Sequence, residues 1–262
     1  MDFTLKKYRE LLENLKQAGF KFLSFNEFCM VKPHGKFIIL RHDIDKNPKN
    51  ALSISQIEFE LGIKSSFYFR ISDDVFKPDI IKKIASMGHE IGYHYRDLVD
   101  SKGDLALAIN KFESNLETFR KIVPVHTIVM DGCPLSKYDN RNLWKTYNYR
   151  EFGIVGEPYF DINFDEVFYI TDTGRCWDGH KFNIRDIVNT KFKLSYHNTS
   201  AIIKSINNST FPDNVLITSH PQRWTNNLFY WGIEFISQNF KNLIKQLLNK
   251  RKITLNYLHL QK

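Results

Sequence analysis

Two carboxylates separated by one residue follow an apolar run near the start of the chain. The segment "KFIILRHDID" ends in Asp43 and Asp45. Alternate residues of an extended strand point to the same side, so both carboxylates would face one way. Because like charges repel, such a pair favours a shared proton or a nearby cation. One carboxylate could bind a divalent metal while the other takes a proton from water; a capping or turn role is the alternative for either alone.

Further polar residues follow apolar runs later in the chain. In "GHEIGYHYRD", His94 could bind a metal through its imidazole, and Asp97 could be a ligand or orient that ring. His89 precedes the run, so we expect it to cap a turn or face solvent. Asp131 follows "TIVM" and precedes a glycine, which fits either a ligand or an Asp-Gly turn. His220 follows "NVLITS" and could be a general acid or a core histidine; the next residue, proline, holds it extended.

The surrounding segments alternate between strands and helices. Apolar runs predict strands at about 37–41, 65–70, 89–95, 125–130 and 214–224. Amphipathic spacing and glycine or proline stops predict helices at about 4–18, 48–61, 77–88, 103–123, 199–207 and 226–250. This alternation is typical of a parallel sheet or barrel, in which the carboxyl ends of the strands meet at one mouth. The polar residues fall at those ends, and the irregular stretch 132–180 is expected to supply functional loops.

The bulk composition predicts one domain over residues 1–262, with the helices at 4–18 and 226–250 packing on the barrel. The chain is 42% hydrophobic and has no evident linker or repeat. No apolar run approaches the roughly 18 residues of a membrane helix. The N-terminus lacks the apolar centre of a secretory signal. We therefore expect a cytoplasmic protein without a transmembrane segment. The three cysteines form no CxxC pair, which indicates reduced thiols.

The net charge of +8 is partly concentrated in "KNLIKQLLNKRK" near the C-terminus. The simplest interpretation is the solvated face of an amphipathic helix. A phosphate-bearing substrate or an anionic membrane surface is the alternative. No nucleic-acid-binding motif accompanies the charge, so a nucleic-acid partner is not expected.

Taken together, these segments resemble the polysaccharide deacetylase superfamily, also called the NodB-homology or carbohydrate esterase family 4 group. The similarity is greatest to a branch found in bacterial surface-polysaccharide biosynthesis. It spans about residues 37–245 and rests on "LRHDID", "GHEIGYHYRDL", "YNYREFGIVGEPYFDI", "YITDTGRCWDG" and "SHPQRW". The resemblance implies an α/β fold, a distorted (β/α) barrel with about seven parallel strands instead of eight, and a metal at the strand mouth.

The resemblance also implies roles for individual residues. Asp43 matches the family's catalytic base, and His220 matches its general acid. The residues expected to orient the base or bind substrate are Arg41, Arg175, Trp177 and Arg223.

The metal ligands implied by the resemblance include one departure from the family pattern. Asp45 and His94 match an aspartate and the first of two histidines, but the second histidine is replaced by Leu98. Asp131 would complete the set, with Asp97 as the alternative. An Asp-His-Asp set is harder and more negative than one aspartate with two histidines, which should raise the pKa of a bound water. Zinc is expected first, with manganese, iron or cobalt as alternatives.

The leading functional hypothesis is a metal-dependent hydrolase that removes an N-acetyl group from a sugar or glycan precursor. In a cytoplasmic protein the substrate could be phosphate-linked, which would suit the basic surface. A carbohydrate-binding pseudoenzyme is the first alternative, because the second histidine is absent. A hydrolase of another non-peptide C–N amide bond is the second.

Overall fold

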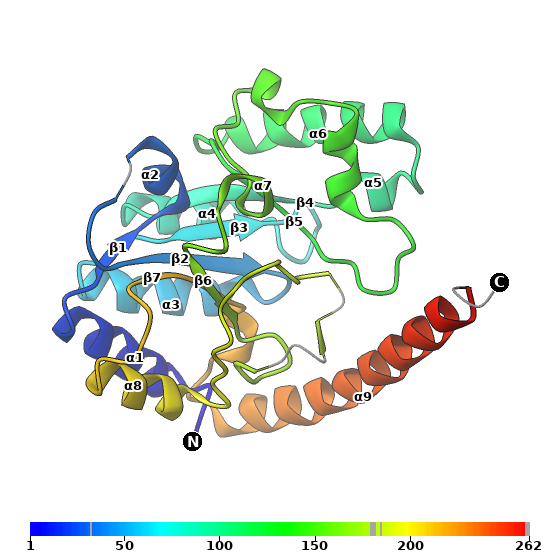
Figure 1. Ribbon diagram of the computed structural model, residues 1–262. Coiled ribbons are helices and arrows are strands. Elements are labelled where there is room, and N and C mark those ends of the chain that lie inside the picture. Colours follow the sequence, from blue (N-terminus) through cyan, green and yellow to red (C-terminus); the bar gives the residue numbers. More distant parts are fainter. Residues whose placement is uncertain (32, 179–181, 184, 260–262) are drawn as a thin grey trace.

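Among the described residues, seven parallel strands form one curved sheet (Figure 1). The computed structural model describes residues 1–31, 33–178, 182–183 and 185–259, with the side chains of the last helix described to residue 247. The strands are β1 (Lys21–Leu23), β2 (Phe37–Ile44), β3 (Ser66–Phe69), β4 (Glu90–Tyr95), β5 (Ile128–Met130), β6 (Phe168–Thr171) and β7 (Asn214–Ser219). Their order is β5-β4-β3-β2-β7-β6, and β1 pairs with the first half of β2. The expected α/β fold with about seven parallel strands is confirmed, as a sheet left open between β5 and β6.

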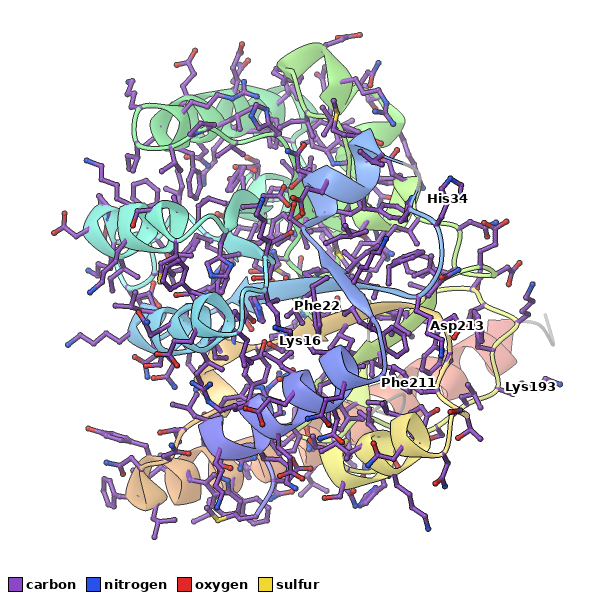
Figure 2. All side chains as sticks on the ribbon, turned by 90° about the vertical axis from the view of Figure 1, so that its left-hand side faces the viewer. Lys16, Phe22, His34, Lys193, Phe211 and Asp213 are labelled. Atoms are coloured by element: carbon purple, nitrogen blue, oxygen red, sulfur yellow. The ribbon has the colours of Figure 1, made fainter. Side chains whose placement is uncertain are left out.

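Helices connect the strands and cover the sheet. They are α1 (Leu5–Gln17), α2 (Phe25–Met30), α3 (Pro48–Glu60), α4 (Pro78–Ser86), α5 (Asp97–Asp100), α6 (Leu105–Arg120), α7 (Pro158–Asp161), α8 (Thr199–Asn207) and α9 (Leu228–His259), with 3-10 turns η1 (Asn140–Lys145), η2 (Tyr149–Phe152) and η4 (Pro221–Arg223). The helices α1 and α8 lie side by side, as Figure 2 shows in blue and yellow. The start expected for α1 is confirmed, because the Thr4 hydroxyl accepts a hydrogen bond from the backbone of Lys7.

Some elements differ from the sequence expectation. The strands β1 and β6 and the helix α2 were not expected. The strand β6 lies within residues 132–180, a segment whose many turn residues predict irregular structure. The helix α9 begins at Leu228 and continues to His259, beyond the expected end at 250. No glycine or proline follows Gly232 within it, so the sequence contains no stop signal there. No helix of the described residues is long and apolar enough to cross a membrane.

Side chains of the strands alternate between the helix-covered face and the opposite, concave face. Along β2, Ile38 and Leu40 belong to the main hydrophobic core, whereas Ile39 belongs to a smaller cluster on the other face. The same alternation places Arg41 and Asp43 on the concave face, because a strand repeats every two residues.

A buried polar network lies on the helix side, under the strand ends. His42 bonds through Nδ1 to Ser219 Oγ and through Nε2 to Glu58 Oε1, each at 2.7 Å. His89 contacts the Ser55 carbonyl at 3.0 Å and is buried, so the expectation that it caps a turn or faces solvent is wrong. The network links β2 to α3 and to β7. It lies directly beneath the residues that follow β2 and β7.

Candidate metal and catalytic site

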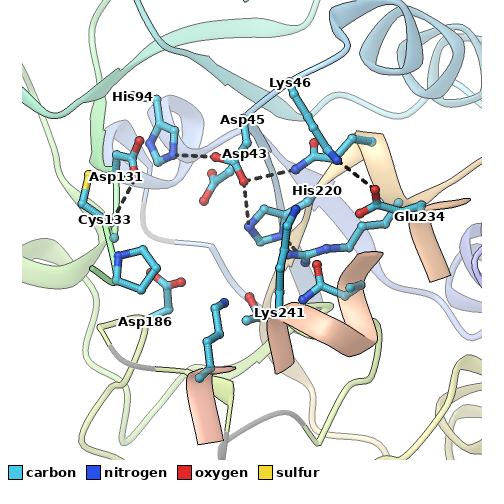
Figure 3. A pocket seen from close by; sticks show the side chains of 17 residues that line it. Asp43, Asp45, Lys46, His94, Asp131, Cys133, Asp186, His220, Glu234 and Lys241 are labelled. Atoms are coloured by element: carbon cyan, nitrogen blue, oxygen red, sulfur yellow. Dashed lines mark hydrogen bonds and ion pairs between the residues drawn. The ribbon is translucent and has the colours of Figure 1, made fainter. Parts of the chain in front are cut away.

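Polar side chains from four strand ends meet at the mouth of the sheet (Figure 3). Asp45 follows β2, His94 lies in β4, Asp131 follows β5 and His220 follows β7. The parallel ladders bring these strand ends to one edge, and the two-residue alternation turns their side chains to the concave face. Residues that are far apart in the chain are thereby brought to one pocket.

Asp45, His94 and Asp131 could together hold a metal ion. One ligand atom from each lies within 4.8 Å of the others. The Nε2 atom of His94 is 3.6 Å from an Asp45 carboxylate oxygen. Two tetrahedral ligands, each about 2.1 Å from one zinc ion, would be roughly 3.4 Å apart. The donor set therefore fits a divalent cation with only small shifts.

The His94 ring is oriented for this role by the backbone. Its Nδ1 atom lies 3.1 Å from the carbonyl oxygen of Val129 and donates to it. In the neutral ring this bond fixes the tautomer and leaves the Nε2 lone pair facing the carboxylates, as is usual for metal-binding histidines. Burial alone would lower the pKa of His94, but Asp43 and Asp45 raise it to about 9. Without a metal the carboxylates thus retain a proton on the ring, so the cluster attracts positive charge.

Two arginines partly balance Asp131. The Nη1 atom of Arg70 is 3.2 Å from Asp131 Oδ2, and that of Arg96 is 3.6 Å away. Arg70 also donates to the backbone carbonyl of Asp45. These contacts hold the β3 and β5 ends together and reduce the excess negative charge of an Asp-His-Asp set.

Asp43 is held rigidly at the edge of the pocket by Arg41. The guanidinium donates from Nε to Oδ1 at 2.8 Å and from Nη2 to Oδ2 at 2.5 Å. Burial would raise the pKa of Asp43, but Arg41 and then His94 lower it overall. Arg41 is fully buried and does not line the pocket. It therefore orients the carboxylate and does not contact a ligand in the pocket.

His220 is paired with a buried aspartate, Asp172, that follows β6. The carboxylate accepts from His220 Nδ1 at 2.6 Å and from the His220 backbone N–H at 3.0 Å. Arg223 and Trp224 donate to the same carboxylate at 2.5 and 2.8 Å. Burial would raise the pKa of Asp172, but Arg223 and His220 lower it to about 2. The aspartate is thus ionised and points His220 Nε2 towards Asp45, 3.9 Å away.

The pocket has a volume of about 240 Å³ and is closed on one side by α9; its lining includes Asp43, Asp45, His94, Asp131 and His220. Glu234, Gln238, Lys241 and Lys245 of α9 reach into it at intervals of three and four residues. Figure 3 shows the Glu234 carboxylate paired with Lys46, at 2.8 Å. This wall could not be predicted from the sequence, because nothing in the local pattern of α9 reveals which face of the helix meets the strand ends.

Two residues expected to bind substrate, Trp177 and Arg175, lie elsewhere. Trp177 is buried and donates from Nε1 to Thr199 Oγ1 at 2.9 Å, outside the pocket. Arg175 packs against aromatic rings, with its guanidinium carbon 4.5 Å from the Trp231 ring centroid. The motif "TDTGRCWDG" therefore supplies neither the expected pocket wall, Trp177, nor the expected substrate contact, Arg175. The turn folds back onto the start of α9 instead. Of the residues expected to bind substrate, Arg223 does line the pocket.

Asp97 is also directed away from the pocket. Its carboxylate accepts from the Tyr93 hydroxyl at 2.8 Å and from Asn115 at 2.7 Å. Burial raises its pKa to about 6. Of the two candidates for the third ligand, the structure places Asp131 and not Asp97 beside His94. Leu98 is likewise buried in the hydrophobic core, so the position of the family's second histidine does not face the pocket.

Asp172 and Arg70 are not among the residues that the sequence motifs predict for the site. Both obey the rule that a polar residue directly after an apolar strand lies at the mouth of the sheet. Arg70 ends the run "SSFYFR", and Asp172 follows "FYIT". The signal was therefore present in the sequence, but the short β6 strand that carries Asp172 was not recognised.

Comparison of the sequence with protein-family profiles and with curated proteins gives no match. Comparison of the structure finds the Xyl-CE4 domain of a multidomain xylanase from the hindgut metagenome of Trinervitermes trinervoides, with 14% identity, 81% of this chain and 85% of that chain covered, and a TM-score of 0.41. Peptidoglycan deacetylase PdaC from Bacillus subtilis has 14% identity, coverage of 82% and 99%, and a TM-score of 0.38. A family 4 carbohydrate esterase from Bacillus anthracis has 16% identity, coverage of 82% and 93%, and a TM-score of 0.36.

Proposed function

We propose that this chain is a metal-dependent hydrolase that removes the acetyl group from the nitrogen of an N-acetylated sugar. One observation carries the proposal: a metal-ligand set, a fixed carboxylate and a histidine–aspartate pair all face one pocket. Amide hydrolysis needs these three functions, namely polarisation of the carbonyl, removal of a proton from water and protonation of the leaving nitrogen.

The metal would be held by Asp45, His94 and Asp131, which offer two oxygens and one nitrogen. When bound, a divalent cation there would act as a Lewis acid towards the acetyl carbonyl and would favour ionisation of water. We expect zinc first, and manganese, iron or cobalt as alternatives, because oxygen-rich sets bind these harder ions well.

Asp43 is the proposed general base. Arg41 holds both of its oxygens, and the side chain borders the pocket beside Asp45. As an ionised carboxylate it can accept a proton from the attacking water while its own orientation is maintained. Such fixed geometry matters because proton transfer requires the base within hydrogen-bond reach of the water.

His220 is the proposed general acid. Asp172 accepts from its Nδ1, which leaves Nε2 directed at the pocket. The protonated ring can give its Nε2 proton to the sugar nitrogen as the C–N bond breaks. The products are then acetate and a free amine, and the proton removed by Asp43 returns to solvent or to His220 for the next cycle.

The substrate proposed here carries phosphate next to the N-acetylated sugar. Lys241 and Lys245 face the pocket, and no hydrogen bond or ion pair to either amine is found among the described residues. Burial and then neighbouring cations, Lys46 and Arg223 respectively, lower the pKa of both amines. An anionic group bound between them would relieve this repulsion, which a neutral glycan could not do.

Acetate release tests the deacetylase proposal. Purified protein with added zinc, manganese or cobalt should release acetate from N-acetylated sugars, and Asp43→Asn should stop release while metal stays bound. A carbohydrate-binding pseudoenzyme, which the leucine at position 98 favours, would bind sugar and release nothing. Release of a different acid from a non-sugar amide would instead identify a hydrolase of another C–N bond.

The phosphate requirement is tested with two substrates that share the same sugar. Replacing Lys241 and Lys245 together by glutamine should raise KM for an N-acetylated sugar diphosphate about 10-fold or more and leave KM for the neutral sugar nearly unchanged. Lys204→Gln, on the exposed surface of α8, is the matched control. An equal change in KM for both substrates would contradict a phosphate subsite without contradicting deacetylation.

A further inference from the structure

The outer face of α9 is apolar and exposed. Phe229, Ile233, Ile236, Phe240, Leu243 and Leu247 are each between 50% and 71% exposed. We call these six residues the outer seam. They repeat at intervals of four and three residues, which corresponds to 3.5 residues per turn and places them in one stripe along the helix.

The opposite face of α9 is polar and meets the rest of the molecule. Glu234, Gln238, Lys241 and Lys245 line the pocket, and Asn242 donates to the Gly174 carbonyl at 2.8 Å. A surface helix of a globular protein normally has the reverse arrangement, with the apolar stripe towards the core. Figure 1 shows α9, in orange and red, along one border of the molecule with its C-terminal part extending past the sheet. The outer seam is therefore a surface that lacks a partner among the described residues.

The outer seam is large enough to form a stable interface. Side chains of this size expose on the order of 150–250 Å² when free. At the observed exposures the six residues, with the neighbouring Ile244, present roughly 700 Å² of mostly apolar surface. A typical specific interface buries about 800 Å² on each partner. A monomer rarely leaves an apolar patch of this size in water.

The residues beside the outer seam indicate what covers it. The positions that flank a coiled-coil contact on α9 are all uncharged: Tyr230, Gly232, Ser237, Asn239, Ile244 and Gln246. Two copies of the helix could therefore approach without repulsion between like charges. A helix that lies on an anionic membrane instead needs basic residues bordering its apolar face. Here the described lysines of α9, Lys241 and Lys245, face the pocket on the other side.

The outer seam is also complementary to itself when two helices run in opposite directions. Antiparallel pairing about position 238 places Phe229 opposite Leu247, Ile233 opposite Leu243 and Ile236 opposite Phe240. This arrangement separates the two basic segments "KRK" at residues 250–252, whereas parallel pairing would bring them together. In this arrangement the positive end of each helix dipole also lies beside the negative end of the other, which is favourable.

We propose that two copies of this chain form a symmetric dimer by antiparallel pairing of their α9 helices through the outer seam. Such a contact uses the same surface on both copies and closes after two. Because the polar face of α9 forms one wall of the pocket, pairing on the outer face would also hold that wall against the strand ends. The dimer itself does not depend on the proposed deacetylase function.

Mass measurement of the full-length protein tests the dimer. We expect light scattering at tens of micromolar to give twice the chain mass of 31.0 kDa. The double change Ile236→Glu and Phe240→Glu should give a monomer with unchanged circular dichroism, since both side chains are exposed in one copy. Leu107→Glu, at an apolar position on α6 that is 55% exposed, is the control and should remain a dimer. A monomeric wild-type chain, or a dimer that survives the double change, would overturn the proposal.

Two further measurements separate the alternatives. Oxidation of an equal mixture of Phe229→Cys and Leu247→Cys chains should join unlike chains, while neither variant alone gains a cross-link over wild type. The two positions are about 27 Å apart along the helix, so cross-linking of either variant alone would exclude the antiparallel arrangement. If the wild-type chain is monomeric and sediments with anionic phospholipid vesicles, and the glutamate changes abolish that, the outer seam is a membrane-binding surface instead.

Discussion

Replacing Asp172 by asparagine should impair His220 without disturbing the metal ligands. The buried carboxylate accepts bonds from the backbone and ring of His220, from Arg223 and from Trp224. Asparagine keeps the shape but removes the charge, and its amide group offers only one oxygen. The ring of His220 then loses both its fixed direction and the charged acceptor of its Nδ1 hydrogen bond.

The size of the effect follows from the bond that is lost. A hydrogen bond to a charged group contributes about 1.5–3 kcal/mol. If that stabilisation is needed in the transition state, the loss corresponds to a fall in kcat of roughly 10-fold to 150-fold. Misorientation of the ring adds to this, and the corresponding aspartate exchange in serine proteases lowers kcat about 10⁴-fold. We therefore expect a fall of about 100-fold or more, with little change in KM.

The assay is acetate release under saturating metal, with metal content measured on the same samples. Asp178→Asn is a matched control, because Asp178 pairs with His197 at 3.0 Å on the surface, outside the pocket. A merely structural role for Asp172 would lower the melting temperature and leave kcat of the folded fraction unchanged. A folded Asp172→Asn variant whose kcat is within twofold of wild type would refute the role assigned to the pair.

Three further changes test the site and its support. Asp97 has a folded-state pKa of about 6 against 3.8 for an ordinary carboxyl, so its contribution to stability is present below about pH 4 and is lost as the pH rises through 6. Asp97→Asn should remove that slope, worth about 3 kcal/mol, from urea melts and leave bound metal unchanged; loss of metal would restore Asp97 as a ligand. Leu98→His should lower the free energy of unfolding by about 2–4 kcal/mol, since the site is in the core, and a gain in metal affinity would contradict this. Arg41→Met should lower the free energy of unfolding by about 3–5 kcal/mol by leaving Asp43 unpaired, and a loss below 1 kcal/mol in denaturant melts would show that Arg41 is dispensable.

The strand ends could be predicted because two simple signals coincide there. Asp43, Asp45, His94, Asp131 and His220 all follow or end apolar runs, and parallel strands bring such positions together. These signals could not predict that Asp131, and not Asp97, faces the pocket. The residue at 97 begins a short helix after β4, and its direction depends on partners in a distant helix.

Other parts of the site depend on contacts that no local pattern contains. The motif "TDTGRCWDG" contains both the important Asp172 and the structural Trp177, and residue type alone favoured the tryptophan. The α9 wall depends on which face of a long helix meets the sheet. Its apolar stripe would conventionally be placed inward, yet the lysines face the pocket. Only the arrangement in space shows that the apolar face is the outer one.

The central claim is tested most directly by measuring metal content and acetate release together for the wild-type chain and Asp43→Asn. The site predicts about one divalent ion per chain in both, with acetate released from an N-acetylated sugar by the wild type alone. Absence of bound metal, and no acetate after addition of zinc, manganese or cobalt, would contradict a metal-dependent deacetylase. Loss of the metal in Asp43→Asn would show instead that Asp43 is a ligand and not the base.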